Sequence, residues 1–360
     1  MRIVDLRPAL EQQFSRRWGE GNPHPVKGNP LSSLWTKTAD ALIGRRVEGR
    51  PRPPSRPFVL SVGNLALGGT GKTPVIIALA RDLARQGKTG CVLTRGFKSP
   101  LAGPLPVRPD NVLAGDEARL MSLQLADQSW PVIQSRDRAQ GFAYIMQEYP
   151  DLDYILIEDG HQTRNLGRHL DILILDRWVE AAGSHGPLLK AVTAPVFPFG
   201  PYRESAKGAR RAGILLVETA QAIPSTGRDG QATATYTRRV KLSPVNPGVT
   251  GPLPQGGYAA LSGIARPVPF EAGLEQATGR APQVSVRLKD HQEYGPRLVG
   301  RVIREIDQDG TLPLVTTAKD WVKLEALWPA ERMVFVADLE LEWGQPNALP
   351  QLVRERAESY

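Results

Sequence analysis

The fold of this chain is decided by the stretch Ser61-Val62-Gly63-Asn64-Leu65-Ala66-Leu67-Gly68-Gly69-Thr70-Gly71-Lys72-Thr73-Pro74. The apolar residues 58–60 before it are typical of a buried strand, and residues 75–86 after it have the spacing of a helix. A glycine-rich turn between a strand and a helix lets backbone N–H groups approach an anion closely. The stretch therefore predicts a site for the phosphates of a nucleotide.

The residues at the end of this loop carry the expected chemistry. Lys72 can reach the β- and γ-phosphates, and the Thr73 hydroxyl can bind Mg²⁺. Ala66 stands where the common phosphate-loop pattern has its first glycine. A glycine-rich turn with a surface lysine is the alternative, but it does not explain Lys-Thr at the start of a helix. We expect the phosphates to be held by Gly68, Gly69, Thr70, Gly71, Lys72 and Thr73.

Strand-like runs alternate with helical stretches from residue 58 to about 220. The expected strands cover residues 58–62, 90–94, 154–158, 172–176 and 214–217. This alternation predicts an α/β fold like that of phosphate-loop nucleoside triphosphatases, with a mostly parallel sheet sandwiched by helices. Ligands of such sheets bind where the strands end. Gly63, Arg95 and Glu158-Asp159 all stand at such strand ends.

A second, smaller α/β domain is expected near the C-terminus, because strands and helices alternate again from Tyr258 onward. The segment before it is poor in large apolar side chains, which predicts a linker with a short pair of strands. The predicted division is a basic N-terminal segment at 1–57, a phosphate-loop domain at 58–220, the linker at 221–250, the second domain at 251–345 and a C-terminal tail at 346–360.

Composition excludes several classes of protein. No run of about 18 apolar residues occurs, so no transmembrane helix is expected. The single cysteine, Cys91, excludes a disulfide framework and favours a reducing compartment. The N-terminus lacks the apolar core of a secretory signal. No zinc-ligand spacing and no aromatic stacking pattern is found, so nucleic acid is not expected as a partner.

The positive charge is concentrated near the N-terminus. The chain has a net charge of +8, and residues 1–57 hold 11 Lys and Arg against 5 Asp and Glu. Residues 30–46 predict an amphipathic helix with Leu31, Leu34, Trp35, Ala39, Leu42 and Ile43 on one stripe, followed by Arg45, Arg46, Arg50, Arg52 and Arg56. Such a stripe suits an anionic membrane surface. The same periodicity fits a helix that packs on its own domain, and the sequence leaves both open.

Two carboxylates, Glu158 and Asp159, end an apolar strand of the phosphate-loop domain. From that position a carboxylate holds Mg²⁺ directly or through water. The polar side chain of Gln162 follows and would face the same crevice. Asp116 stands at a helix start, where a cap with acids that match the helix dipole is the simpler interpretation.

Three further places could take part. Arg95 and Gly96 end the second strand and could hold an anion. Arg203 and Glu204 stand together in a proline-rich loop, where a structural ion pair is the simpler interpretation. Asp290-His291 ends a strand of the second domain, and an Asp-His pair can orient a general base, although a histidine in a loop is more often inert.

Taken together, these segments resemble the tetraacyldisaccharide 4′-kinases of lipid A biosynthesis. The resemblance covers about residues 30–325, and the shared order and spacing of the motifs make it specific. The motifs are Val62-Gly63-Asn64 with Gly68 to Pro74, Thr94-Arg95-Gly96-Phe97, Gly115-Asp116-Glu117, Glu158-Asp159-Gly160-His161-Gln162, Gly200-Pro201-Tyr202-Arg203-Glu204, Ser262 to Pro267, Asp290-His291 with Tyr294, and Thr317-Ala318-Lys319-Asp320 with Lys323-Leu324.

The resemblance implies a function and a place in the cell. The family transfers the γ-phosphate of ATP to the 4′-hydroxyl of a tetraacylated glucosamine disaccharide 1-phosphate, which forms lipid IVA. It implies ATP and Mg²⁺ as cofactors, and a peripheral protein on the cytoplasmic face of the inner membrane. We expect the acylated disaccharide and an anionic membrane surface as partners, and a monomer.

The resemblance also implies roles for single residues. Asp116 and His291 would form the pair that activates the acceptor hydroxyl, with Lys72 as the third catalytic residue. Thr73, Glu158, Asp159 and Glu204 would serve Mg²⁺, Arg203 the phosphates, and Asn64, Arg95, Gly96 and Gln162 the acceptor. The chain departs from the family pattern at three places: Glu158 where the family usually has aspartate, Thr163 where it has histidine and Ser205 where it has proline.

Two other functions compete with this one. A divergent phosphate-loop kinase could phosphorylate another glycolipid. A phosphate-loop ATPase or GTPase could act as a nucleotide-switched assembly factor, but the Asn-Lys-x-Asp motif of guanine recognition is absent from the sequence.

Overall fold

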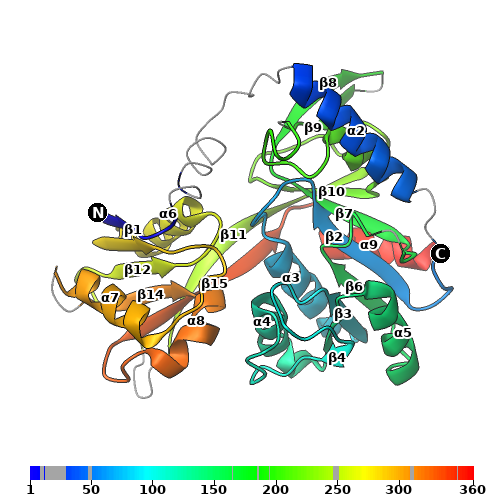
Figure 1. Cartoon of the computed structure of the whole chain (residues 1–360). Coiled ribbons are helices and arrows are strands. Elements are labelled where there is room, and N and C mark those ends of the chain that lie inside the picture. The colour runs from blue at the N-terminus through cyan, green and yellow to red at the C-terminus, as the bar shows by residue number, and fades with distance from the viewer. Residues whose placement is uncertain are drawn as a thin grey trace. The chain divides into compact units, whose positions relative to one another are not determined.

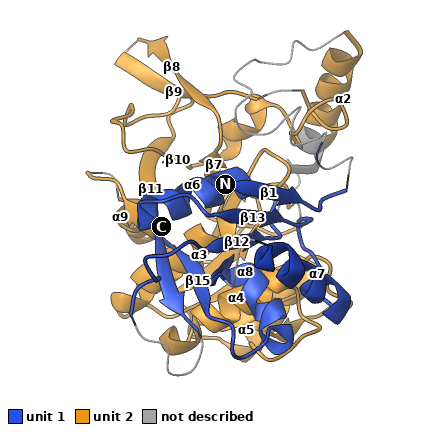
Figure 2. Cartoon of the chain, turned by 90° about the vertical axis from the view of Figure 1, so that its left-hand side faces the viewer, with its two compact units in different colours: residues 1–24, 238–340 blue, residues 25–237, 341–360 orange. Residues whose placement is uncertain are grey.

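A computed structural model describes residues 1–8, 12, 30–47, 51–163, 165–184, 186–193, 195–245, 251–308, 312–346 and 348–360, without the side chains of 43–47. The chain divides into two compact units, which Figure 2 colours separately. Unit 1 comprises residues 1–24 and 238–340, and unit 2 comprises residues 25–237 and 341–360. Each unit contains both strands and helices (Figure 1).

The sheet of unit 2 is built around β2 (Phe58–Asn64), all of whose residues are buried. Its strands lie in the order β11-β10-β7-β2-β6-β3-β5-β4. The described pairs are parallel except that of β4 with β5. The strands besides β2 are β3 (Gly90–Thr94), β4 (Leu105–Pro106), β5 (Val132–Gln134), β6 (Tyr154–Glu158), β7 (Leu170–Leu175), β10 (Ile214–Glu218) and β11 (Ala232–Pro244).

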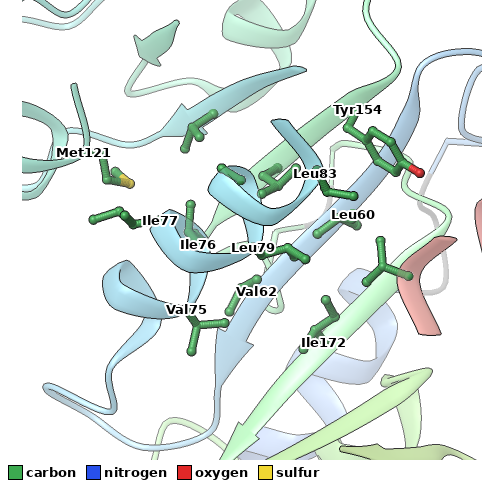
Figure 3. Packing of buried hydrophobic residues seen from close by; sticks show 14 of the residues in the cluster. Leu60, Val62, Val75, Ile76, Ile77, Leu79, Leu83, Met121, Tyr154 and Ile172 are labelled. Atoms are coloured by element: carbon green, nitrogen blue, oxygen red, sulfur yellow. The ribbon is translucent and has the colours of Figure 1, made fainter. Parts of the chain in front are cut away.

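Helices cover both faces of this sheet, because successive residues of its strands face opposite sides. Leu60 and Val62 pack in one cluster with α3 (Lys72–Arg85), as Figure 3 shows. Val59 packs in another cluster, on the side of α5 (Arg138–Glu148). The remaining elements of unit 2 are α2 (Pro30–Val47), α4 (Asp116–Gln124), the 3₁₀ turns η1 (Ala126–Gln128) and η2 (Ala206–Arg211), the antiparallel hairpin of β8 (Trp178–Gly183) and β9 (Gly186–Ala191), and α9 (Leu349–Glu358).

Unit 1 is a smaller parallel sheet with the strand order β1-β13-β12-β14-β15. These strands are β1 (Arg2–Asp5), β12 (Ala259–Ser262), β13 (Val284–Arg287), β14 (Leu314–Thr317) and β15 (Val334–Trp343). Its helices are α6 (Pro267–Thr278), α7 (Pro296–Asp307), α8 (Ala318–Leu324) and the 3₁₀ turn η3 (Glu325–Leu327). Side chains of α7 and α8 pack in one core cluster and those of α6 in another.

The mostly parallel α/β fold is therefore confirmed, while the expected connections differ from the structure. The two-stranded linker at 221–250 is wrong: β11 is one strand of 13 residues. Residues 232–236 pair with β10 in unit 2, and the later residues belong to unit 1. A strand whose two halves serve different units has no single hydrophobic face, so its sequence gives the weak pattern of a connection.

The two ends of the chain also differ from the expected segments. Residues 2–5 form an edge strand of unit 1, whereas α2 belongs to unit 2, so residues 1–57 are not one segment. The expected tail at 346–360 contains α9, whose Leu349 and Val353 are fully buried in the core of unit 2. Among the described residues, no helix combines the length and hydrophobicity needed to cross a bilayer.

Candidate active site

The phosphate loop joins β2 to α3, as the sequence predicts. Gly68 and Gly71 have φ values of +95° and +85°, and Gly71 is the residue from which α3 starts. Glycine adopts this left-handed conformation without the steric cost that a Cβ brings. The helix begins at Lys72, three residues earlier than the expected Val75, so the backbone N–H groups of its first turn are available to an anion.

The carboxylates at the end of β6 lie next to this loop. β6 pairs with β2 in parallel, with Glu158 beside Val62, and the backbone N–H of Asp159 donates to the carbonyl of Val62 at 2.9 Å. Asp159 has a φ of +52°, in the left-handed region that aspartate tolerates better than most residues. The strand therefore ends in a sharp turn beside the phosphate loop.

Two cations converge on Asp159. Lys72 Nζ lies 3.6 Å from its Oδ1, and Arg203 Nη1 donates to Oδ1 and Oδ2 at 2.9 and 2.8 Å. Lys72 also donates to the Asn64 side-chain oxygen at 3.4 Å. The structure thus brings together four of the residues that the resemblance assigns to phosphate, metal and acceptor.

Burial by itself would raise the pKa of Asp159, but the charges of Lys72 and Arg203 outweigh it and hold the pKa below its ordinary value. Its neighbour Glu158 behaves in the opposite way. Burial, followed by the negative charges of Glu117 and Asp159, raises the pKa of Glu158 to about 7. The Thr94 hydroxyl donates to Glu158 Oε2 at 2.8 Å. The adjacent carboxyls therefore differ in protonation near neutral pH.

Arg203 and Glu204 do not form the ion pair that their adjacency suggests. Arg203 binds Asp159, whereas Glu204 accepts from Arg211 Nη2 at 2.7 and 2.8 Å. Gln162 Nε2 donates to Glu204 at 2.7 Å and to the carbonyl of Asn64 at 3.0 Å. Glu204 therefore holds Gln162 and Arg211 in this arrangement, and its expected role toward Mg²⁺ stays a prediction.

Asp116 opens α4 near the ends of β3 and β5. The preceding Gly115 donates its N–H to Gln134 Oε1 at 2.9 Å, and a Cβ on Gly115 would lie 3.0 Å from the Cα of Gly96. A Cβ on Gly96 itself would come within 2.0 Å of the Gln134 side chain. Gly96 therefore lets the start of α4 approach the end of β3, and Arg95 beside it is exposed.

His291 belongs to unit 1, on the loop after β13. Its φ is +55°, and its Nε2 lies 4.0 Å from Asp290 Oδ1. Lys319 Nζ lies 3.2 Å from the same Nε2 and 3.3 Å from Asp290 Oδ1. The structure describes Asp116 and His291 in different units, so their expected joint action remains a prediction.

The donor set fits a nucleoside triphosphate with Mg²⁺. Thr73, Glu158 and Asp159 offer hydroxyl and carboxylate oxygens, which Mg²⁺ prefers, and this ion commonly takes only one or two carboxylates beside phosphate and water. Lys72 and Arg203 supply the positive charge that phosphates require. Within the described part of the chain, no group of three or more His, Cys, Asp and Glu could hold a metal.

Sequence reasoning missed two cations of this site. Arg138 donates from Nη2 to the carbonyls of Glu158 and Asp159 at 2.9 and 3.1 Å, which ties the turn to α5. Arg211 binds Glu204 from the end of η2. Neither arginine lies in a motif that carries the family resemblance. Arg138 follows the end of β5, and a position after a strand end could have indicated it. However, β5 has only three residues, which is too short for a clear strand pattern in the sequence.

Comparisons with known proteins show the family of the chain. The sequence profile of the tetraacyldisaccharide-1-P 4′-kinase family matches residues 29–358. Proteins named tetraacyldisaccharide 4′-kinase from Maricaulis maris and Phenylobacterium zucineum are each 32% identical, over 87% and 83% of this chain and 86% and 84% of their own lengths. A crystal structure of LpxK from Aquifex aeolicus in complex with ATP covers 91% of this chain and 97% of its own, at 25% identity and a TM-score of 0.64. The chain belongs to the tetraacyldisaccharide-1-P 4′-kinase family.

Proposed function

We propose that this protein transfers the γ-phosphate of ATP to the 4′-hydroxyl of a tetraacylated glucosamine disaccharide 1-phosphate, the step of lipid A biosynthesis that yields lipid IVA. The observation that carries the proposal is the convergence of Lys72 and Arg203 on Asp159 beside a phosphate loop, in a chain of this family. ATP is bound in the related crystal structure, and Mg²⁺ is the metal that such kinases use.

The residues around the loop divide the work on the donor. The N–H groups of Gly68 to Gly71 and the start of α3 bind the phosphates, and Lys72 and Arg203 neutralise the charge of the transferred group. Thr73, Glu158 and Asp159 would hold Mg²⁺, which would help to neutralise the charge of the phosphates. When the phosphates are bound, Lys72 and Arg203 contact phosphate oxygens in place of part of their contact with Asp159.

Six residues are assigned to the acceptor. Asp116 and His291 activate the 4′-hydroxyl as a pair, which holds and removes its proton during transfer. Asn64, Arg95, Gly96 and Gln162 contact the acceptor. Arg95 is exposed at a strand end, and this supports a role in binding an anionic group of the disaccharide.

We also propose that the protein acts as a monomer at the cytoplasmic face of the inner membrane, as a peripheral protein that binds anionic lipid through α2. The exposed fractions of Leu31, Leu34 and Leu42 are 67%, 64% and 48%, which supports this role. Of the basic residues, Arg52 and Arg56 are exposed, while Arg50 and the side chains of Ile43, Arg45 and Arg46 lie outside the described residues.

A transfer assay tests the function. Labelled phosphate from ATP should appear on tetraacyldisaccharide 1-phosphate in detergent micelles. Lys72→Ala should abolish transfer without unfolding the protein, because the lost cation is worth several kcal/mol in the transition state. Lys88→Ala is the matched control. Lys88 is an exposed lysine that precedes β3, at the end of the strand opposite to Arg95. Native turnover by Lys72→Ala would reject the role of this loop, and failure of the wild type with this acceptor would favour another glycolipid.

A further inference from the structure

A lysine of unit 1 contacts His291 directly. Lys319 is the second residue of α8, and its Nζ lies 3.2 Å from His291 Nε2 and 3.3 Å from Asp290 Oδ1. All three side chains are at least two-thirds buried. A lysine, a histidine and a carboxylate therefore form one compact group at the carboxyl ends of β13 and β14.

The start of α8 is fixed by the fully buried Asp320. Its carboxylate accepts from the N–H of Gly263 at 2.9 Å, the hydroxyl of Tyr294 at 3.0 Å and the hydroxyl of Thr317 at 2.7 Å. These donors come from the loops after β12 and β13 and from the end of β14. Since all three are tied to one carboxylate, the backbone that carries Lys319 keeps its place relative to the His291 loop.

The chemistry of the two side chains determines where the imidazole proton lies. An ammonium group has three donors and no lone pair, so it can approach a ring nitrogen this closely only if that nitrogen accepts. The carboxylate of Asp290 beside Lys319 favours the charged ammonium. His291 Nε2 is therefore the acceptor, and the proton of a neutral ring lies on Nδ1.

We propose that Lys319 is a positioning residue, which holds His291 as the neutral tautomer protonated on Nδ1 and fixes the direction of its ring. In this state His291 presents an N–H donor from Nδ1, and its Nε2 is engaged by Lys319. His291 then assists transfer by donating a hydrogen bond to an oxygen, either of the carboxylate that takes the proton or of the substrate. The tautomer rests on the geometry of unit 1, and only its catalytic consequence rests on the proposed function.

Nitrogen NMR of the full chain tests the tautomer without any turnover. The chain has five histidines, so ¹⁵N-histidine labelling gives few signals, and loss of one set in His291→Gln assigns His291. At pH 8 the wild type should show a protonated Nδ1 and an unprotonated Nε2. Lys319→Met should move the proton toward Nε2. A protonated Nε2 in the wild type, or an unchanged pattern in Lys319→Met, would overturn the proposal.

Lys323→Met is the matched control, because Lys323 lies one turn later in α8. Lys323 donates to the carbonyl of Gln292 at 2.8 Å and lies over the Tyr294 ring. It should leave the His291 signals where they are. If Lys323→Met shifts them as much as Lys319→Met does, the effect comes from a general loosening of α8 and the proposal fails.

Phosphate transfer then tests the consequence. Lys319→Met should lower kcat by about tenfold or more with little change in KM for ATP, and Lys319→Arg should recover much of the loss, since guanidinium also only donates. In a His291→Gln background, Lys319→Met should cost little further, because residues that act as a unit are not additive. Equal losses in both backgrounds would contradict a role through His291. If the wild type transfers no phosphate, the proposed function fails, while the NMR result stands separately.

Discussion

Glu158 and Asp159 are neighbours with opposite electrostatic environments. Lys72 and Arg203 face Asp159 and lower its pKa, whereas burial and the acids Glu117 and Asp159 raise that of Glu158. Two carboxyls whose pKa values are driven apart are typical of sites that handle charge or protons. The hydrogen bond from the Thr94 hydroxyl fixes the Glu158 side chain.

The raised pKa of Glu158 makes stability depend on pH. Between its ordinary value of 4.5 and about 7, the folded chain keeps a proton that the unfolded chain has released. The free energy of unfolding therefore falls as pH rises through this window, by up to about 1.4 kcal/mol per pH unit. Glu158→Gln removes this loss, so without Mg²⁺ the variant should gain up to about 3 kcal/mol relative to wild type between pH 5 and pH 8.

Urea unfolding at the two pH values measures this change. Glu148→Gln is the control, since Glu148 is an exposed carboxylate at the end of α5. It should leave the pH dependence of the wild type unchanged. Parallel pH profiles for Glu158→Gln and wild type would show that Glu158 is ionised throughout the window.

At the scale of the element, α2 is attached to unit 2 by polar contacts and leaves apolar side chains exposed. Asp40 accepts from the N–H and hydroxyl of Ser205 at 3.0 and 2.5 Å, and the Trp35 indole N–H donates to the carbonyl of Phe197 at 2.7 Å. The sequence left open whether this helix packs on its own domain or binds a membrane. The structure shows the contact of α2 with its own domain. Membrane binding through the exposed leucines stays a prediction.

Replacing the exposed leucines tests membrane binding without removing the helix. Leu31→Ser, Leu34→Ser and Leu42→Ser together should weaken sedimentation with phosphatidylglycerol vesicles more than tenfold, because each buried leucine contributes about 1 kcal/mol or more. Leu123→Ser is the control, an exposed leucine on α4. Salt should weaken the remaining binding through the arginines. Equal binding by the triple variant and the control would show that α2 does not enter the bilayer.

The C-terminal helix α9 stabilises unit 2. Leu349 is fully buried in the same cluster as α3, whereas Leu352 is only partly buried. Leu349→Ala should lower the free energy of unfolding by about 2–4 kcal/mol, through lost transfer energy and a cavity. Leu352→Ala should cost clearly less. Chemical denaturation measures both, and equal losses would contradict the core position of Leu349.

At the scale of the whole molecule, the chain passes between its two units along strands. The unit boundaries fall inside β11, between Thr237 and Arg238, and inside β15, between Glu340 and Leu341. Each strand therefore belongs to both units, and the two candidate groups for acceptor activation lie in different units. Their proposed joint use would bring both side chains to one acceptor hydroxyl during turnover.

Kinetics of three variants test this pair. Asp116→Ala and His291→Ala should each lower kcat strongly with little change in KM for ATP. The double variant should be hardly slower than the slower single variant, because the two residues would act as one unit. Circular dichroism checks that all three are folded. Losses that multiply in the double variant would remove the pair from the mechanism and leave activation to Asp116 or to the carboxylates after β6.

Features that depend on residues close together in the chain could be predicted from the sequence. The strand, the glycine-rich turn and the helix at Lys72 lie within about 30 residues, and each is specified by local periodicity and by glycine. The position of the carboxylates at the end of β6, near the phosphate loop, was predicted because the ends of parallel strands meet at one edge of a sheet.

Which charged groups meet depends on the folded chain and could not be predicted from the sequence. Arg203 binds Asp159, 44 residues away, and not its neighbour Glu204, which binds Arg211. Lys319 meets His291 across 28 residues because α8 and the loop after β13 are tied to one buried carboxylate. A charged side chain in a sequence has many possible partners, and the local pattern is the same for each of them. Long-range packing selects one, since a buried charge is stable only beside the partner that the fold brings to it.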